Sequence, residues 1–335
     1  MDCCPTRSAD APLTYADVEA AERRIAGTGF VTPLLESPPL NRHLGGRLLL
    51  KAENLQVTGS FKLRGAANRL AVLTPEERRR GVVARSSGNH GLAVAYCADR
   101  VGTTVVVVAP DTAPASKTDR IRGYGAAVVQ APMHEVAAVA AGIVAREGRV
   151  LVPPADDRWV VAGQGTVGVE IARQAAEANA AVDDLLVCCS GGGLLAGCIL
   201  AMRGRSPRTR VHAVEAAGFE KMRNSLAAGR RLDLPPGGRS ICDAITGPYT
   251  AEVPFGVARG GVAGTLAVTD EEAAEAMRVA FGEFGLAVEP GGAVALAAVL
   301  AGRFPVRDRT VVAILSGRNV NLDLAARALR GEALG

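Results

Sequence analysis

Short runs rich in valine and leucine alternate with longer amphipathic stretches along nearly the whole sequence, and this alternation narrows the possible folds more than any other feature. Most short runs are apolar on both faces, as in strands of a parallel sheet that helices cover on both sides. The longer stretches carry apolar residues at helical spacing. The pattern therefore predicts an α/β fold with doubly wound, mostly parallel sheets.

The predicted strands and helices follow one another in turn. The strands cover residues 48–52, 82–85, 104–109, 127–130, 150–152, 185–189, 211–214, 265–268 and 311–315. The helices cover residues 15–26, 60–73, 90–101, 115–124, 135–146, 167–178, 194–203, 271–283 and 293–301. Thr269 is a suitable N-cap for the helix at 271–283, because acidic residues fill the first turn after it.

The composition of the 335 residues argues against several classes of protein. Hydrophobic residues make up 48% of the chain, enough to bury a sizeable core. The formal net charge of +4 is small, so nucleic-acid binding has little support. The first 15 residues lack the pattern of a signal peptide, and the apolar runs are too short to span a bilayer. Seven cysteines without metal-binding spacing suit a reducing compartment, so we expect a cytoplasmic protein.

Lysine is rare in this chain although basic residues are not. Among 38 basic residues, 34 are arginines, and the only lysines are Lys51, Lys62, Lys117 and Lys221. Where a surface needs only positive charge the chain uses arginine, so a retained lysine is a candidate for chemistry that a guanidinium cannot perform. Imine formation is one such reaction. Chance retention is the alternative, and it suffices for two or three of the four.

Three loops that follow predicted strands are rich in glycine and small polar residues. Residues 190–193 (SGGG) precede a helix, so their backbone N–H groups suit a phosphate. Residues 86–91 (SSGNHG) have the hydroxyl, amide and backbone donors that suit a carboxylate. Ser316 ends the last strand and can bond a neutral ring nitrogen. Because the carboxyl ends of parallel strands face the ligand crevice, we expect the three loops to converge.

Each motif also has a plainer interpretation. The glycine run at 190–193 could be only a tight turn, or the start of a dinucleotide fingerprint whose third glycine, Gly197, is one residue late. His90 could be a general base, but no acidic neighbour in the sequence orients it, so a capping role is favoured.

Five motifs, at residues 60–65, 86–91, 162–166, 190–194 and 316–320, occur in the order and spacing of the fold-type II pyridoxal-phosphate enzymes. The chain resembles in particular the serine/threonine dehydratase (ammonia-lyase) and serine racemase family, over roughly residues 15–330. This resemblance implies a tryptophan synthase β-like fold with the cofactor cleft between two domains. It implies a large pyridoxal-phosphate-binding domain (1–54 and 156–335), a small substrate-side domain (55–155), no C-terminal regulatory domain, and a homodimer.

The resemblance also implies roles for individual residues. Lys62 carries pyridoxal 5'-phosphate as a Schiff base and removes the substrate's α-proton, and Phe61 packs beside the cofactor. Asn89 bonds the phenolic oxygen of the cofactor, and Ser316 pairs with its pyridine nitrogen. Ser87 occupies the position of a second acid/base. The cofactor phosphate lies on Ser190, Gly191, Gly192, Gly193 and Leu194. The substrate carboxylate lies on Ser86, Ser87, Gly88 and His90.

The activity that follows from the resemblance is conversion of a β-hydroxy amino acid, by default L-threonine or L-serine, to a 2-oxo acid and ammonia. A dehydratase specialised for hydroxyectoine breakdown, 3-hydroxyaspartate or phenylserine is an alternative, and so is an amino-acid racemase. From other classes, an NAD-dependent dehydrogenase and a catalytically inactive binding protein are conceivable. The second is disfavoured because Lys62, Asn89, Ser316 and the glycine loop are all present.

Three positions depart from the family pattern. Family members often bind a divalent cation at a site to which Glu215 corresponds, but Lys221 stands at the second acidic position. We therefore expect no metal ion there. Arg318 replaces a glycine, and it could keep the ring nitrogen unprotonated, contact a polar substrate group, or point to solvent. Residues 242–244 (CDA) replace a common Asp-Gly pair, so that loop is expected to differ around the cofactor.

Overall fold

The strands of the chain form two separate sheets. The structure, a computed structural model, describes residues 11–334. Strands in the order β1-β2-β10-β7-β8-β9 form a six-stranded sheet, and strands in the order β5-β4-β3-β6 form a four-stranded sheet. All neighbours pair in parallel except β1 and β2. The predicted α/β class with mostly parallel sheets is confirmed.

The larger sheet consists of β1 (Leu34–Glu36), β2 (Arg47–Ala52), β7 (Asp184–Cys188), β8 (Arg210–Ala216), β9 (Val262–Val268) and β10 (Thr310–Leu315). The smaller sheet consists of β3 (Val82–Arg85), β4 (Val105–Pro110), β5 (Ala127–Ala131) and β6 (Val150–Val152). All nine predicted strands are present, with ends within three residues of the prediction. The short β1 was missed, because three residues are too few to show a period.

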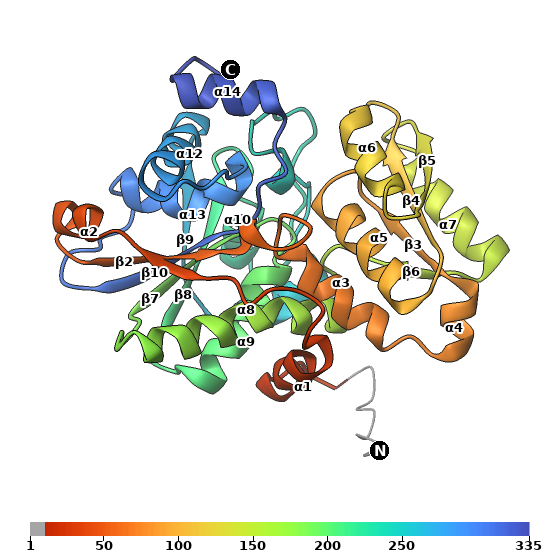
Figure 1. Cartoon of the computed structure of the whole chain (residues 1–335), viewed down its shortest axis with the longest axis horizontal. Coiled ribbons are helices and arrows are strands. Elements are labelled where there is room, and N and C mark those ends of the chain that lie inside the picture. Colours follow the sequence, from red (N-terminus) through yellow and green to blue (C-terminus); the bar gives the residue numbers. More distant parts are fainter. Residues whose placement is uncertain (1–10, 335) are drawn as a thin grey trace.

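Helices cover both faces of each sheet (Figure 1). They are α1 (Tyr15–Ile25), α2 (Pro38–Leu44), α3 (Lys62–Ala71), α4 (Pro75–Arg80), α5 (Asn89–Val101), α6 (Ala115–Arg122), α7 (Val136–Glu147), α8 (Arg158–Glu177), α9 (Gly193–Arg205), α10 (Lys221–Ala228), α11 (Glu252–Ala258), α12 (Asp270–Phe284), α13 (Pro290–Leu300) and α14 (Leu322–Arg330). Helices α8 and α9 lie on one side of the larger sheet and α12 and α13 on the other. The predicted Thr269 cap is present as a capping box with Glu272. The helices α2, α4, α10, α11 and α14 were not predicted, because one or two turns give little periodic signal.

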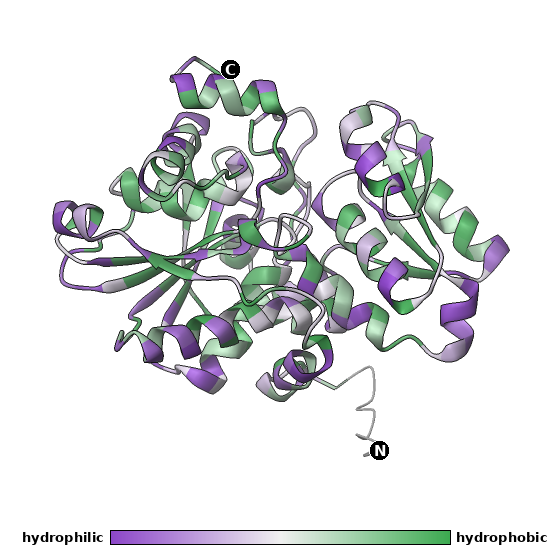
Figure 2. Cartoon of the chain, in the orientation of Figure 1, coloured by the Kyte–Doolittle hydropathy of each residue, from purple (hydrophilic) through white to green (hydrophobic). Residues whose placement is uncertain are grey.

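Hydrophobic residues fill the strands of both sheets, whereas hydrophilic residues gather on the outer faces of the helices (Figure 2). Every residue of β7 is buried, as is the helix α13 from Pro290 to Val299. Continuous burial on both faces is the reason that the central strands read as unbroken apolar runs in the sequence. Within residues 11–334, no helix is both long and apolar enough to cross a membrane.

The helix predicted at 167–178 begins nine residues earlier than expected, at Arg158. Asp157 starts it by accepting hydrogen bonds from the N–H groups of Trp159 and Val160. The glycines at 163 and 165, which belong to the 162–166 motif, both lie inside the helix. A β-carbon at Gly163 would lie 2.5 Å from the Arg64 carbonyl oxygen, and one at Gly165 would lie 2.8 Å from the Gly197 carbonyl oxygen. These glycines therefore allow α3 and α9 to pack closely on α8.

The two sheets suggest where the chain divides. The four strands of the smaller sheet lie between residues 82 and 152, and all strands of the larger sheet lie before 53 or after 183. On this basis we propose domain boundaries near residues 55 and 155. The prediction that the chain lacks a signal peptide rests on residues 1–15, most of which lie outside the described part.

The close contact between α8 and α9 predicts that one added methyl group at Gly197 lowers the stability of the protein. A β-carbon at Gly197 would lie 2.4 Å from the Gly165 backbone nitrogen, and backbone cannot give way. We expect Gly197→Ala to lower the free energy of unfolding by about 1–3 kcal/mol, measured by urea denaturation. The matched control is Gly282→Ala, in α12, where a β-carbon meets nothing within 4 Å and the change favours the helix. Equal stability of the two variants would contradict this packing argument.

Candidate active site

Lys62 is the first residue of α3, and it is half-buried. Its Nζ donates a 2.8 Å hydrogen bond to the Pro154 carbonyl oxygen and lies 5.1 Å from the centroid of the Phe61 ring. Burial lowers the pKa of the Lys62 amine to about 8, against the opposing influence of Cys188 and Glu289. An amine with this pKa is substantially neutral in mildly alkaline solution, which is the form needed for a nucleophile or a base.

Asn89 is the first residue of α5, in the part of the chain that forms the smaller sheet. Its side chain connects this part with the loop after β10. Its Nδ2 donates to Glu289 Oε1 at 2.6 Å, and its Oδ1 accepts from Asn319 Nδ2 at 2.5 Å. Gly317 lies directly beside this amide, since a β-carbon there would be 3.2 Å from Asn89 Nδ2. The motifs at 86–91 and 316–320 therefore meet in space, as expected from their positions after strands.

Ser316 directly follows β10 and lies next to the segment that contains Lys62. Its carbonyl oxygen accepts a 3.1 Å hydrogen bond from the Phe61 N–H, so the backbones before Lys62 and after β10 are joined. The Ser316 hydroxyl acts to lower the pKa of the thiol of Cys188, the last residue of β7, although burial has the larger effect. Burial raises the pKa of that thiol to about 11, so it stays protonated near neutral pH. Ser316, Cys188 and Lys62 thus share one buried region.

The glycine loop, residues 190–193, lies between β7 and α9. It is at the same edge of the larger sheet as Ser316, because β7 and β10 run in parallel. Gly192 has a φ of 91°, a left-handed conformation that favours glycine, and it precedes the first residue of α9. A β-carbon at Gly191 would lie 3.1 Å from that of Ala155, the neighbour of Pro154. The Gly191 carbonyl accepts from the Ala251 N–H, and the buried Thr250 hydroxyl beside it has no partner within the described residues. Ser190, Gly193 and Leu194 complete the loop and the start of α9.

The loop at 86–91 connects β3 to α5. The Gly88 N–H donates to Ser86 Oγ at 3.1 Å, and Ser87 lies between them, partly exposed. The predicted capping role of His90 is wrong, because Gly88 is the N-cap of α5. His90 Nε2 instead bonds the Val152 carbonyl oxygen at 2.8 Å, so this nitrogen carries the proton. Burial lowers the pKa of His90 to about 3, which leaves a neutral imidazole next to Lys62.

These residues fit a phosphorylated aldehyde cofactor. An amine with a lowered pKa, a run of glycines with little room for side chains, and a buried Thr250 hydroxyl with no partner among the described residues lie together. The Ser60 hydroxyl, two residues before Lys62, is also buried without a partner in the part of the chain that the structure describes. Orphaned buried polar groups are uncommon in proteins, and a polar ligand satisfies them.

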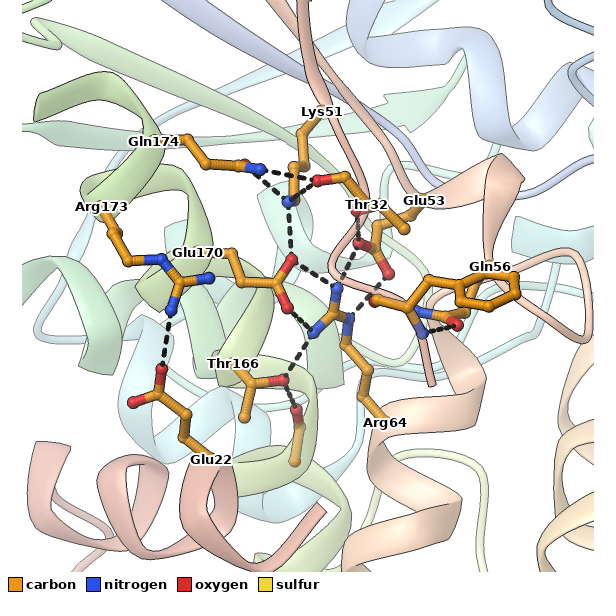
Figure 3. Close-up of polar contacts among 12 residues, drawn as sticks. Glu22, Thr32, Lys51, Glu53, Gln56, Arg64, Thr166, Glu170, Arg173 and Gln174 are labelled. Atoms are coloured by element: carbon orange, nitrogen blue, oxygen red, sulfur yellow. Dashed lines mark hydrogen bonds and ion pairs between the residues drawn. The ribbon is translucent and has the colours of Figure 1, made fainter. Parts of the chain in front are cut away.

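A buried network of four charged residues anchors the helix that carries Lys62 (Figure 3). Arg64 donates to both oxygens of Glu53 and both oxygens of Glu170, at 2.7–2.8 Å. Lys51 Nζ bonds Glu170 Oε2 at 2.7 Å, Gln174 at 2.8 Å and the Thr32 carbonyl at 2.6 Å. The network ties β2 and the following turn to α3 and α8. Sequence reasoning missed it, although the scarcity of lysine had marked Lys51.

The region expected to lack a metal ion is built from a carboxylate and an amine that both have protein partners. Glu215, in β8, accepts hydrogen bonds from the N–H groups of Met222 and Arg223 at 2.8 and 3.0 Å. Lys221 is fully buried, and its Nζ donates to the Ile245 carbonyl at 2.7 Å. Glu215 thus caps the N-terminus of α10. Lys221 holds the turn at Asp243–Ile245, which overlaps the segment 242–244 that departs from the family pattern.

Sequence reasoning missed one further residue, Glu289, and left the role of another, Arg318, undecided. Glu289 was not predicted, because its partners Asn89 and Gly317 come from distant segments. Arg318 does not point to solvent, since its guanidinium donates to the carbonyl oxygens of Asn54 and Gln56. The other two roles considered for Arg318 stay open.

The site can now be compared with known proteins. The family model described as "Pyridoxal-phosphate dependent enzyme" matches residues 25–317. The chain belongs to this family. It is 35% identical to the L-threonine ammonia-lyase of Thermotoga maritima over 319 residues, covering 95% of this chain and 78% of that protein. The family membership favours pyridoxal phosphate as the cofactor over the nicotinamide alternative.

Solved structures of the same family match along nearly the whole chain. A threonine deaminase from the organism abbreviated T.th. is 40% identical with a TM-score of 0.87, covering 92% of this chain and 99% of that one. Maize serine racemase is 31% identical with a TM-score of 0.89, covering 96% and 98%. The resemblance to threonine dehydratases and serine racemases read from five motifs is thereby confirmed.

The surroundings of Glu215 generate a prediction about metals. Both partners of its carboxylate are backbone N–H groups, and the buried Lys221 ammonium repels a cation. We expect Mg²⁺, Ca²⁺ and EDTA to leave the Tm and the activity unchanged. The measurement is thermal unfolding with each addition. A rise in Tm with Mg²⁺, or anomalous density beside Glu215 in crystals soaked in Mn²⁺, would show that the prediction is wrong.

Proposed function

We propose that this enzyme is an ammonia-lyase (dehydratase) that converts a β-hydroxy amino acid, by default L-threonine or L-serine, to a 2-oxo acid and ammonia. The observation that carries the proposal is the placement of the Lys62 amine beside Ser316, the glycine loop and the loop at 86–91. The names of the relatives support the same reaction, since several are threonine dehydratases or ammonia-lyases.

Pyridoxal phosphate, when bound, supplies an electron sink that acidifies the α C–H bond of an amino acid. Lys62 would hold the cofactor covalently. The backbone N–H groups of Gly191, Gly192 and Gly193, with Ser190 and Leu194, would bind its phosphate. Phe61 would pack against its ring. Asn89 would donate to its phenolic oxygen, and Ser316 would bond the ring nitrogen as a neutral partner.

The protein's own residues account for the proton transfers. The amine of Lys62, with a pKa of about 8, takes the α-proton of the substrate. The β-hydroxyl leaves with a proton as water, and the released enamine takes up water to give the 2-oxo acid and ammonia. Ser86, Ser87 and the Gly88 N–H would hold the substrate carboxylate. The pKa of about 3 makes His90 a poor base near neutral pH, so its place is to shape the loop.

Ser87 is the residue on which a racemase reaction would depend. It belongs to the loop between β3 and α5 and would return a proton to the face of the substrate opposite that of Lys62. The match to serine racemases keeps this second candidate in view. The finer properties that we propose from family likeness are a homodimer and a cytoplasmic location.

Replacement of Lys62 tests the centre of the proposal. We expect Lys62→Ala to lose the absorbance of the covalently attached cofactor and to lower the rate of ammonia release at least roughly a hundredfold. The matched control is Lys117→Ala, on α6, whose amine pairs with Asp243 near the surface. This control should keep the absorbance. An unchanged spectrum in Lys62→Ala would refute the assignment of Lys62.

Product analysis distinguishes the two candidate reactions. A panel of L-β-hydroxy amino acids, including threonine, serine, 3-hydroxyaspartate and phenylserine, is assayed for ammonia, 2-oxo acid and the D-amino acid. We expect 2-oxo acid and ammonia in equal amounts, and more of them than of D-amino acid. Faster formation of D-amino acid than of 2-oxo acid would instead support the racemase.

A further inference from the structure

Glu289 occupies the N-cap position of α13, yet its carboxylate makes no capping hydrogen bond with the helix. Its Oε1 instead accepts the 2.6 Å hydrogen bond from Asn89 Nδ2. Glu289 is only 4% exposed, although a buried carboxylate loses much of its hydration. A carboxylate that turns away from a helix N-terminus toward a residue of the active site must serve that residue.

Two glycines lie against Glu289 and the loop after β10. A β-carbon at Gly317 would lie 2.4 Å from Glu289 Oε1, so a side chain at position 317 would displace the Glu289 carboxylate from its present place. A β-carbon at Gly292 would lie 2.7 Å from the Gly317 carbonyl oxygen and 3.2 Å from Glu289 Cγ. The Glu289 N–H donates to the Gly317 carbonyl at 2.9 Å. Two glycines thus hold the start of α13 against the loop that carries Ser316.

The contacts of Asn89 determine how its amide faces the site. Glu289 accepts from one of the two N–H groups of Nδ2, and Asn319 Nδ2 donates to Oδ1. An ionised carboxylate can only accept, so the amide cannot be reversed. Asn89 therefore presents only its second N–H toward a ligand. A donor is what a phenolate oxygen requires.

We propose that Glu289 is a positioning residue that fixes Asn89 as a donor to the cofactor's phenolic oxygen and, through its negative charge, favours the protonated form of the group that joins the cofactor to Lys62. The inference rests on the proposed roles of Lys62 and Asn89. It extends them by adding a charged residue that contacts Asn89 from the side of α13.

The sign of the effect follows from electrostatics. A negative charge favours the protonated form of a neighbouring basic group and so raises its pKa. The charge of Glu289 already acts to raise the pKa of the Lys62 amine. Burial has the larger effect and lowers that pKa. Removal of the Glu289 charge must therefore lower the pKa of the linkage at Lys62.

The charge of Glu289 depends on its surroundings. Burial raises the pKa of Glu289 to about 7, and the Asp243 carboxylate acts in the same direction. The hydrogen bond from Asn89, the Lys117 amine and the Asn319 N–H oppose this rise. The other titratable groups that interact with it are Lys62, Cys188 and Cys242.

The test measures the absorbance of the bound cofactor as a function of pH in the holoenzyme. We expect the midpoint of the absorbance change in Glu289→Gln to lie about 1 pH unit below that of the wild type. The matched control is Glu177→Gln, at the exposed end of α8, which should keep the wild-type midpoint. A lost packing contact alone would not move the midpoint in this way.

A second variant tests the same chain of contacts and leaves Glu289 unchanged. Asn319→Ala removes the donor to Asn89 Oδ1 but keeps the Glu289 charge and its hydrogen bond from Asn89, so the midpoint should stay at the wild-type value. A wild-type midpoint in Glu289→Gln overturns the inference, and so does an equal fall of the midpoint in Asn319→Ala. A wild-type holoenzyme without cofactor absorbance would instead refute the proposed function.

Discussion

The active site depends on the ion network in which Arg64 lies between Glu53 and Glu170. Arg64 is two residues after Lys62, so the contacts that hold its guanidinium also hold the first turn of α3. Lys51 balances the second carboxylate, and the four charges sum to zero in a largely buried region. Removing one member of such a buried set leaves an unpaired charge, which costs about 3–5 kcal/mol. The position of the Lys62 segment is thereby tied to the larger sheet.

Contacts that involve the backbone connect the other parts of the site to the segment around Lys62. The loop after β10 pairs with the segment before Lys62, through the Phe61 N–H and through the bridge between Ser60 and Gly317. The glycine loop after β7 lies against Ala155, and the adjacent Pro154 accepts the bond from Lys62. Asn89 extends from the smaller sheet to Glu289 and Asn319. The carboxyl ends of strands from both sheets thus meet at one amine, as parallel topology requires.

Much of the fold could be predicted because its signals are local. The strands could be recognised from their short runs of Val and Leu, and the glycine and serine motifs marked the loops. The errors have specific physical causes. The start of α8 was missed because Gly163 and Gly165 act as packing surfaces for neighbouring helices, which a single sequence does not show. His90 was taken for a cap, yet it bonds the β6 carbonyl at Val152, 62 residues away.

The sequence by itself determined the α/β class, the five motifs, the likeness to pyridoxal-phosphate enzymes and the choice of Lys62 among four lysines. Those conclusions rest on residues that lie within a few positions of one another. Only the tertiary structure decided that Lys51 and Lys221 are buried, that Glu215 caps α10, and that Glu289 faces Asn89. The physical reason is that a buried charge is stabilised by partners from distant segments, and in a doubly wound fold the order of the strands in space brings those partners together.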